Sequence, residues 1–246
     1  MERRFLAIII ASSIFMPLLL LLDSDGWPRQ LALGIATAAF LFLVVRYSSV
    51  NPAQVLCCIF VATLGEVVLS LGWGLYSYAH AIIPPYVPPG HGLFYTLAAV
   101  TAQQELFRSR AREITRGVLA CGTVIAAVSL IFFNDVWGFL WWLGALALIR
   151  TSRNQLLLSA CFVYTMLLEW FGTAVGNWQW FADVPFVRLH SANPPAGVGI
   201  LYILLDLIVV AITSLRTSSG FHGGETVVHL PARVDVDFEA CPPVFE

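Results

Sequence analysis

The chain has 246 residues, of which 59% are hydrophobic and only 11% are charged, and its formal net charge is −2. A soluble domain carries about 25% charged residues, so this composition excludes an ordinary soluble globular protein. The charge balance also gives no indication of a nucleic-acid partner. We therefore expect an all-α integral membrane protein that crosses the bilayer several times.

The N-terminal run 5–22 begins after two arginines and has the apolar core of a secretory signal peptide. It is about long enough to cross a bilayer, and no A-x-A cleavage site precedes Asp23, so we expect an uncleaved first helix. Seven further apolar runs follow, of which 136–149 is the shortest. The eight predicted spans are 5–22, 30–46, 53–72, 91–107, 117–133, 136–149, 154–172 and 197–215.

The arginines predict how these spans are oriented, because cytoplasmic loops are enriched in basic residues. All 13 basic residues are arginines; with the N-terminus inside, only Arg29 and Arg188 fall on the outer side. We expect cytoplasmic N- and C-termini in a membrane of the bacterial inner-membrane type. Residues 217–246 carry five acidic residues against one arginine, which predicts a loosely ordered acidic tail in the cytoplasm.

Two stretches share a pattern of glycines and paired aromatic residues: SLGWGLYSYAH (70–80) and GTAVGNWQWFAD (172–183). A glutamate in an apolar run precedes each of them, Glu66 before the first and Glu169 before the second. The aligned positions are Gly74, Tyr76 and Tyr78 with Gly176, Trp178 and Trp180, followed by PPGHGLFY (88–95) with PPAGVGILY (194–202).

This similarity indicates an internal duplication. The predicted units are a first four-helix repeat (1–107), a second four-helix repeat (108–216) and the tail (217–246). Four spans in each half make the repeats parallel, so both stretches are expected on the outer face, with the loops 73–90 and 173–196 facing each other. Ser70 and Gly172 stand four residues before the aligned glycines, a spacing that favours close helix approach in membranes.

Three acidic residues within predicted spans are the candidate catalytic residues: Glu66, Glu169 and Asp206. An ionisable group inside a membrane costs several kcal/mol unless it is paired or neutral, so such a residue is by default a functional candidate. The alternative is a structural one, in which each neutral carboxyl hydrogen-bonds a neighbouring helix or loop.

Aromatic and polar residues near these acids are the candidate substrate-binding residues. A protonated carboxyl in an apolar site, surrounded by ring faces that stabilise cations, is suited to protonating an alkene. Tyrosine and tryptophan are also typical of the membrane interface, so packing in the aromatic belt is the alternative. The candidates are Trp73, Tyr76, Tyr78, His91, Tyr95, Trp170, Asn177, Trp178, Trp180 and Tyr202.

Neither a metal nor a cofactor is predicted. The histidines of the outer loops, His80, His91 and His190, lack the spacing of known metal sites. Walker, dinucleotide-binding and nucleophile-elbow patterns are absent, and four of the five cysteines lie in apolar runs, so no disulfide framework is expected.

The run from Glu66 to Tyr78, E-x-x-x-x-x-G-W-G-L-Y-S-Y, resembles the glutamate-glycine-aromatic signature of the membrane carotenoid-biosynthesis family that includes carotenoid hydratases. In general terms it is also similar to small integral-membrane terpene cyclases, which are thought to use buried acids. The similarity covers about forty residues and lacks a phenylalanine-glycine pair of the carotenoid proteins. It implies an isoprenoid or carotenoid-like substrate.

Three functions follow as hypotheses. The first is a membrane-embedded enzyme that performs acid-base chemistry, hydration or cyclisation, on an apolar isoprenoid-like substrate. The second is a small-solute transporter or channel, which a continuous polar path from Glu169 past Asp206 to the inside would favour. The third is a non-catalytic membrane scaffold. The expected partner is a lipophilic small molecule or a membrane lipid.

Overall fold

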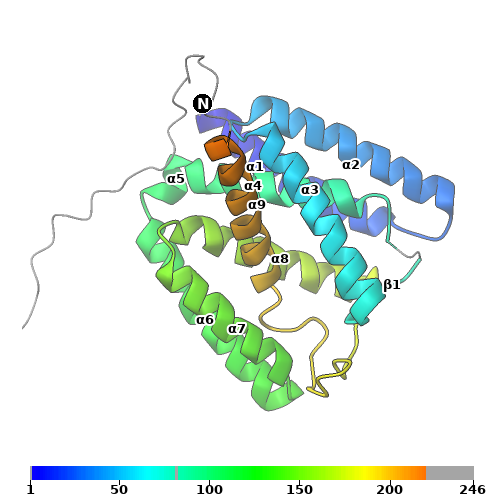
Figure 1. Cartoon of the computed structure of the whole chain (residues 1–246). Coiled ribbons are helices and arrows are strands. Elements are labelled where there is room, and N and C mark those ends of the chain that lie inside the picture. Colours follow the sequence, from blue (N-terminus) through cyan, green and yellow to red (C-terminus); the bar gives the residue numbers. More distant parts are fainter. Residues whose placement is uncertain (1, 81–82, 220–246) are drawn as a thin grey trace, which may run out of the picture.

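The computed structural model describes residues 2–80 and 83–219, and these are mostly helical (Figure 1). The predicted acidic tail lies outside the described residues, except that the last helix continues to Ser219. The elements are α1 (Glu2–Leu22), α2 (Trp27–Tyr47), α3 (Pro52–Glu66), η1 (Val67–Trp73), β1 (Tyr76–Tyr78), α4 (Val87–Gln103), α5 (Glu105–Arg108), α6 (Ala111–Phe133), α7 (Val136–Thr151), α8 (Gln155–Ala174), β2 (Trp178–Trp180) and α9 (Ile200–Ser219).

Among the described residues, five helical segments are long and apolar enough to cross a membrane, which indicates a membrane protein. Two shorter apolar helices, Val136–Thr151 and Ile200–Leu215, accompany them. The all-α expectation therefore fits, whereas the predicted number of eight spans is not confirmed. The five segments are Glu2–Leu22, Trp27–Tyr47, Pro52–Trp73, Ala111–Phe133 and Gln155–Ala174.

Helix α4 occupies the centre of the bundle, where it packs against α1, α2, α3 and α8 (Figure 1). Its neighbours shield it from lipid, so it tolerates histidine, tyrosine and threonine that a lipid-facing helix would not. It begins at Val87 rather than at 91 as predicted, because prolines are accommodated in the first turn of a helix, where the missing N–H is not needed.

Helices α6 and α7 form an antiparallel pair beside α8 (Figure 1). A side chain on Gly122 of α6 would overlap the indole of Trp142, so this glycine allows α7 to approach closely. Trp142 is 1% exposed, so its ring faces the protein and not the lipid.

The region that follows α3 departs from the prediction of one regular helix to residue 72. The helix widens into the π-helical segment η1, and the chain then enters the short strand β1. Strand β1 pairs antiparallel with β2, with Tyr76 opposite Trp180 and Tyr78 opposite Trp178. No strand is predicted here from the sequence, because three-residue strands carry too little alternation to be distinguished from a loop.

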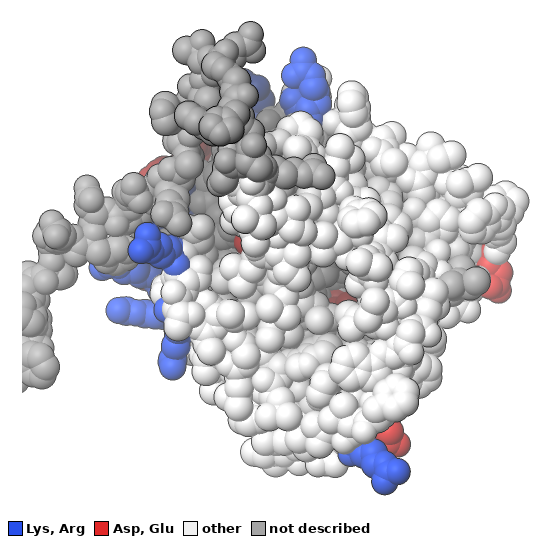
Figure 2. All heavy atoms as spheres, in the orientation of Figure 1, with Lys and Arg blue, Asp and Glu red and all other residues white. Residues whose placement is uncertain are grey.

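Basic side chains gather at one end of the molecule, near the start of α1 and around α5, while the broad face toward the viewer is almost free of charge (Figure 2). A smaller group of charged residues lies at the opposite end. Arg108 lies in α5, and Arg46 and Arg150 lie in the last turns of α2 and α7, respectively. Charge is thus segregated to the ends of the bundle.

Candidate functional site

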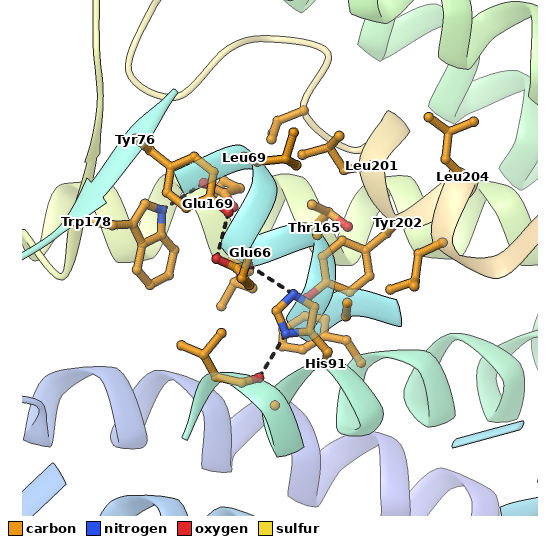
Figure 3. A pocket seen from close by; sticks show the side chains of 18 of the residues that line it. Glu66, Leu69, Tyr76, His91, Thr165, Glu169, Trp178, Leu201, Tyr202 and Leu204 are labelled. Atoms are coloured by element: carbon orange, nitrogen blue, oxygen red, sulfur yellow. Dashed lines mark hydrogen bonds and ion pairs between the residues drawn. The ribbon is translucent and has the colours of Figure 1, made fainter. Parts of the chain in front are cut away.

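A cavity of about 270 Å³ lies where α1, α3, α4, α8 and α9 meet the two-stranded sheet. Most of its wall is apolar, with leucine, valine and aromatic side chains from all five helices. Its ionisable groups are Glu66, His91 and Glu169 together with the hydroxyls of Tyr76, Tyr78, Tyr86 and Tyr202. Figure 3 shows the two glutamates and the histidine lying close to one another.

Glu66 stands at the end of α3 and is 8% exposed. Its Oε2 accepts hydrogen bonds from the hydroxyls of Tyr76 and Tyr78, at 2.7 and 2.8 Å. Burial, together with the Glu66 carboxylate, raises the pKa of Tyr76 and Tyr78 well above the usual value. Each hydroxyl therefore keeps its proton and remains a donor.

His91 of α4 lies within 3.3 Å of Glu66, from Nε2 to Oε1. Its Nδ1 is 2.8 Å from the carbonyl oxygen of Val87, and since a carbonyl only accepts, Nδ1 carries a proton. A hydrogen bond between Nε2 and the Glu66 carboxyl needs one further proton, carried by the imidazole or by the carboxyl. The two side chains are therefore close enough to exchange a proton, as general acid-base chemistry requires. The ring of His91 stacks on Tyr202, with centroids 5.4 Å apart.

Glu169 of α8 is placed in a matching way by the second strand. Its Oε2 accepts from the indole N–H groups of Trp178 and Trp180, each at 2.8 Å. No described residue donates a hydrogen bond to its Oε1. Glu169 lines the cavity, so this second oxygen is available to a proton or to a ligand.

The two glutamate-strand units have the same local construction. In each, the chain leaves its helix through a left-handed glycine, with φ of 75° at Gly74 and 82° at Gly176, which a residue with a side chain adopts only under strain. The first unit has one more residue between glutamate and glycine, and the π-helical segment accommodates it: Leu75 N–H bonds back to Leu69, six residues away, whereas Asn177 N–H bonds to Gly172, five away.

The small residues Ser70 and Gly172 serve their own strands rather than a contact between helices. The Ser70 hydroxyl donates to the carbonyl oxygen of Tyr76 at 3.1 Å. A side chain on Gly172 would overlap the indole of Trp178. The predicted role in helix approach is therefore replaced by a role in positioning the aromatic residues that bind the glutamates.

A Gly172→Ala variant tests this positioning. We expect the added methyl group to displace Trp178, weaken its bond to Glu169 and lower stability by about 1–3 kcal/mol, the usual cost of overpacking. Thermal unfolding in detergent, with tryptophan emission as the signal, measures the effect. Gly117→Ala in α6 is the matched control, since a side chain there meets no atom within 4 Å. Equal melting temperatures for the two variants would contradict the assignment.

Six of the ten predicted substrate-binding residues line the cavity, and four do not. Trp73 donates its indole N–H to the carbonyl oxygen of Pro185 and contacts Trp137. Asn177 donates to Leu20 and Asp23, which joins the second strand to the end of α1. Trp170 is 41% exposed on α8, and Tyr95 is buried away from the cavity. The six that line it are Tyr76, Tyr78, His91, Trp178, Trp180 and Tyr202.

Asp206 is buried in α9 but is not among the described residues that line the cavity. Its carboxyl interacts electrostatically with Cys58, Tyr95 and Cys161. It therefore belongs to the contact region of α3, α4, α8 and α9 rather than to the wall shared by the two glutamates.

The three histidines have different partners and do not form one cluster in the described part of the chain. His80 pairs with Asp25 at 2.6 Å, and His190 forms a backbone bridge with Asp183. Within residues 2–80 and 83–219, no group of three or more histidine, cysteine, aspartate or glutamate residues is arranged to hold a metal ion.

Two aspartates, the half-buried Asp23 and the fully buried Asp135, organise the surroundings of the site and were not singled out from the sequence. Asp23 accepts hydrogen bonds from Gln30, Tyr86 and Asn177, so it ties the end of α1 to α2, α4 and the second strand. Asp135 fixes the loop that precedes α9. Asp23 follows an apolar helix and Asp135 precedes one. From the sequence alone, an aspartate at the end of a helix is expected to be a solvent-facing cap.

Comparison of the chain with protein-family models, with curated proteins and with solved structures gave no match. The site geometry is therefore the basis for a functional proposal.

Proposed function

We propose that this protein is a membrane-embedded enzyme that protonates a carbon-carbon double bond of an apolar, isoprenoid-like substrate, leading to hydration or cyclisation. The observation that carries this proposal is that Glu66, His91 and Glu169 line one cavity whose remaining wall is mostly apolar. An apolar cavity with a few convergent ionisable groups is the usual form of a site for small lipophilic ligands.

The different surroundings of the two glutamates support different roles. Glu169, with Oε1 left without a donor from the described residues, is proposed as the acid that transfers its proton to the alkene. The resulting carbocation lies among aromatic rings, whose faces stabilise positive charge. Tyr202 and Trp178 are candidates for this role because both line the cavity.

The Glu66–His91 pair is proposed as the base. In hydration, water adds to the cation and the pair accepts the proton that the water loses; in cyclisation, the pair accepts a proton from an adjacent carbon. One proton enters the substrate and one leaves it, so the reaction consumes no oxidant or reductant. The acid is restored when the proton returns to Glu169 through water.

The asymmetry between the halves of the chain supports this division. His91 aligns with Val198, and both line the cavity, so only one of the two glutamates has an imidazole partner. We propose that the chain arose by duplication of a glutamate-strand unit within two parallel halves, 1–107 and 108–216, and that the two copies then diverged into acid and base. The paired strands and the matching left-handed glycines support this origin.

The arginine distribution supports an orientation with both termini in the cytoplasm, since basic residues concentrate at cytoplasmic ends. In a membrane of the bacterial inner-membrane type, the sheet and the nearby cavity would then lie toward the outer leaflet. We prefer the enzyme to a transporter because Asp206, which a polar path would need, lies off the cavity wall among the described residues.

An isotope experiment tests the proposal. The purified protein, reconstituted in phospholipid nanodiscs, is incubated in D₂O with a panel of acyclic isoprenoids that includes squalene and lycopene. We expect a product that carries deuterium on carbon, because the acid delivers a solvent-derived proton to the alkene. If no substrate gains carbon-bound deuterium above the level of empty nanodiscs, the proposal is wrong. Uptake of a solute into proteoliposomes without conversion would instead favour a transporter.

A further inference from the structure

The cavity reaches the side of the bundle between α3 and α9. Val61, Gly65 and Leu69 of the α3–η1 segment and Leu204 and Ile208 of α9 line it. Leu204 and Ile208 are 39% and 44% exposed, so the same residues that line the cavity also form the outer surface. Figure 2 shows acidic atoms at the bottom of a hollow in this otherwise uncharged face.

The hollow opens at a depth where a membrane is hydrocarbon. Leu204 and Ile208 lie about 6 and 12 Å along the helix axis from the start of α9 at Ile200, given a rise of 1.5 Å per residue. Leu64 and Val68, on the same α3–η1 segment, are apolar and more than half exposed. The bilayer core is about 30 Å thick, so the opening faces lipid chains and not water.

The volume limits what the cavity holds. Each water molecule of the liquid fills about 30 Å³, so 270 Å³ has room for on the order of ten non-hydrogen atoms. A membrane lipid or a long isoprenoid is larger than this. One end of such a molecule fills the cavity, and the rest remains outside.

From these observations we infer that the cleft between α3 and α9 is a lateral portal, through which one hydrocarbon end of a long-chain isoprenoid lipid passes directly from the bilayer to Glu66 and Glu169. The rest of the chain stays among the lipids of the leaflet opposite the arginine-rich end. This inference rests on the proposed function for the identity of the lipid, but the portal itself is tested by binding.

Gly65 makes a clean test possible. It lines the cavity, and a Cβ atom built on it meets no atom within 4 Å, so a side chain at this position starts in open space. Gly65→Phe would obstruct the portal, whereas Gly65→Ala would leave it open. Gly117→Phe is the matched control, because Gly117 is equally free of neighbours but lies on the exposed side of α6.

The probe is geranylgeraniol with a diazirine at its hydrocarbon end, incorporated into phospholipid vesicles that contain the protein. After illumination, mass spectrometry locates the labelled residues. We expect labelling of cavity residues in wild type, Gly65→Ala and Gly117→Phe, and about a tenfold loss in Gly65→Phe, the equivalent of about 1.4 kcal/mol. Gel filtration of each variant confirms that it is folded.

Three results would overturn the portal: unlabelled cavity residues in the wild type, equal labelling in Gly65→Phe, or a second copy of the chain cross-linked across Leu204 and Ile208. Turnover measured on the same samples separates this inference from the proposed function. Loss of labelling in Gly65→Phe without any wild-type conversion leaves the portal supported and the enzyme rejected. If Gly65→Phe converts the substrate as fast as the wild type, the enzyme is supported and the portal is rejected.

Discussion

Glu169→Gln is expected to reduce deuterium incorporation into the substrate by roughly 10²-fold to 10⁴-fold, the usual contribution of a general acid. The glutamine oxygen still accepts the indole N–H groups of Trp178 and Trp180, so the fold is retained. What disappears is the dissociable proton on the oxygen that faces the cavity. Turnover in nanodiscs and the melting temperature of the variant together measure the two effects.

Glu66→Gln is expected to cause a loss of similar size for a different reason. The amide oxygen accepts the hydroxyls of Tyr76 and Tyr78, and the amide N–H donates to Nε2 of a neutral His91. The contacts are preserved, but no proton remains to be exchanged between the two side chains. A base is then lost without a change in packing.

Glu113→Gln is the control for both variants, because Glu113 is exposed on α6 and remote from the cavity wall. If Glu66→Gln and Glu169→Gln melt well below wild type but retain its turnover, the glutamates hold the strands in place and do no chemistry. The scaffold hypothesis would then gain over the enzyme.

Asp135→Ala is expected to cause a large loss of stability, about 3 kcal/mol or more. The carboxylate is fully buried and accepts four hydrogen bonds. Three come from backbone N–H groups, of Gly138, Ala192 and Ala196, and the fourth from the hydroxyl of Ser129. A buried N–H group left without an acceptor costs about 1–3 kcal/mol, and alanine leaves three.

The consequence reaches the cavity, because residues 192 and 196 belong to the loop that leads into α9. Asp135→Asn is expected to rescue the variant only in part, since an amide N–H₂ group in either carboxylate position opposes at least one backbone N–H group. Unfolding in detergent measures the loss, with Asp183→Ala, at an exposed loop position, as the control. A melting temperature within error of the control would contradict this role.

Much of the arrangement was predictable from local pattern. Continuous apolar runs identified membrane helices, because a helix in lipid must be apolar along its whole length. The spacing of glutamate, glycine and paired aromatics identified both halves of the site. Four of the six candidate binding residues that line the cavity, Tyr76, Tyr78, Trp178 and Trp180, do so because each belongs to a short strand held next to its glutamate by the chain itself.

The candidate residues that lie off the cavity wall have a common explanation. Trp73, Tyr95 and Trp170 are of the same residue types as the lining residues, but the direction in which each points depends on the helix or loop packed beside it. Asp206 satisfies the same sequence criterion as Glu66, an acid within an apolar run, yet neighbouring helices place it off the cavity wall.

The sequence by itself therefore determined that the protein is a membrane protein, and which short segments carry its acids and aromatic residues, because hydropathy and local spacing are properties of the chain alone. Only the tertiary structure decided that the two glutamates line one cavity, that His91 serves just one of them, and that Asp135 fixes the loop before α9. These contacts join segments up to a hundred residues apart, and no local pattern records them.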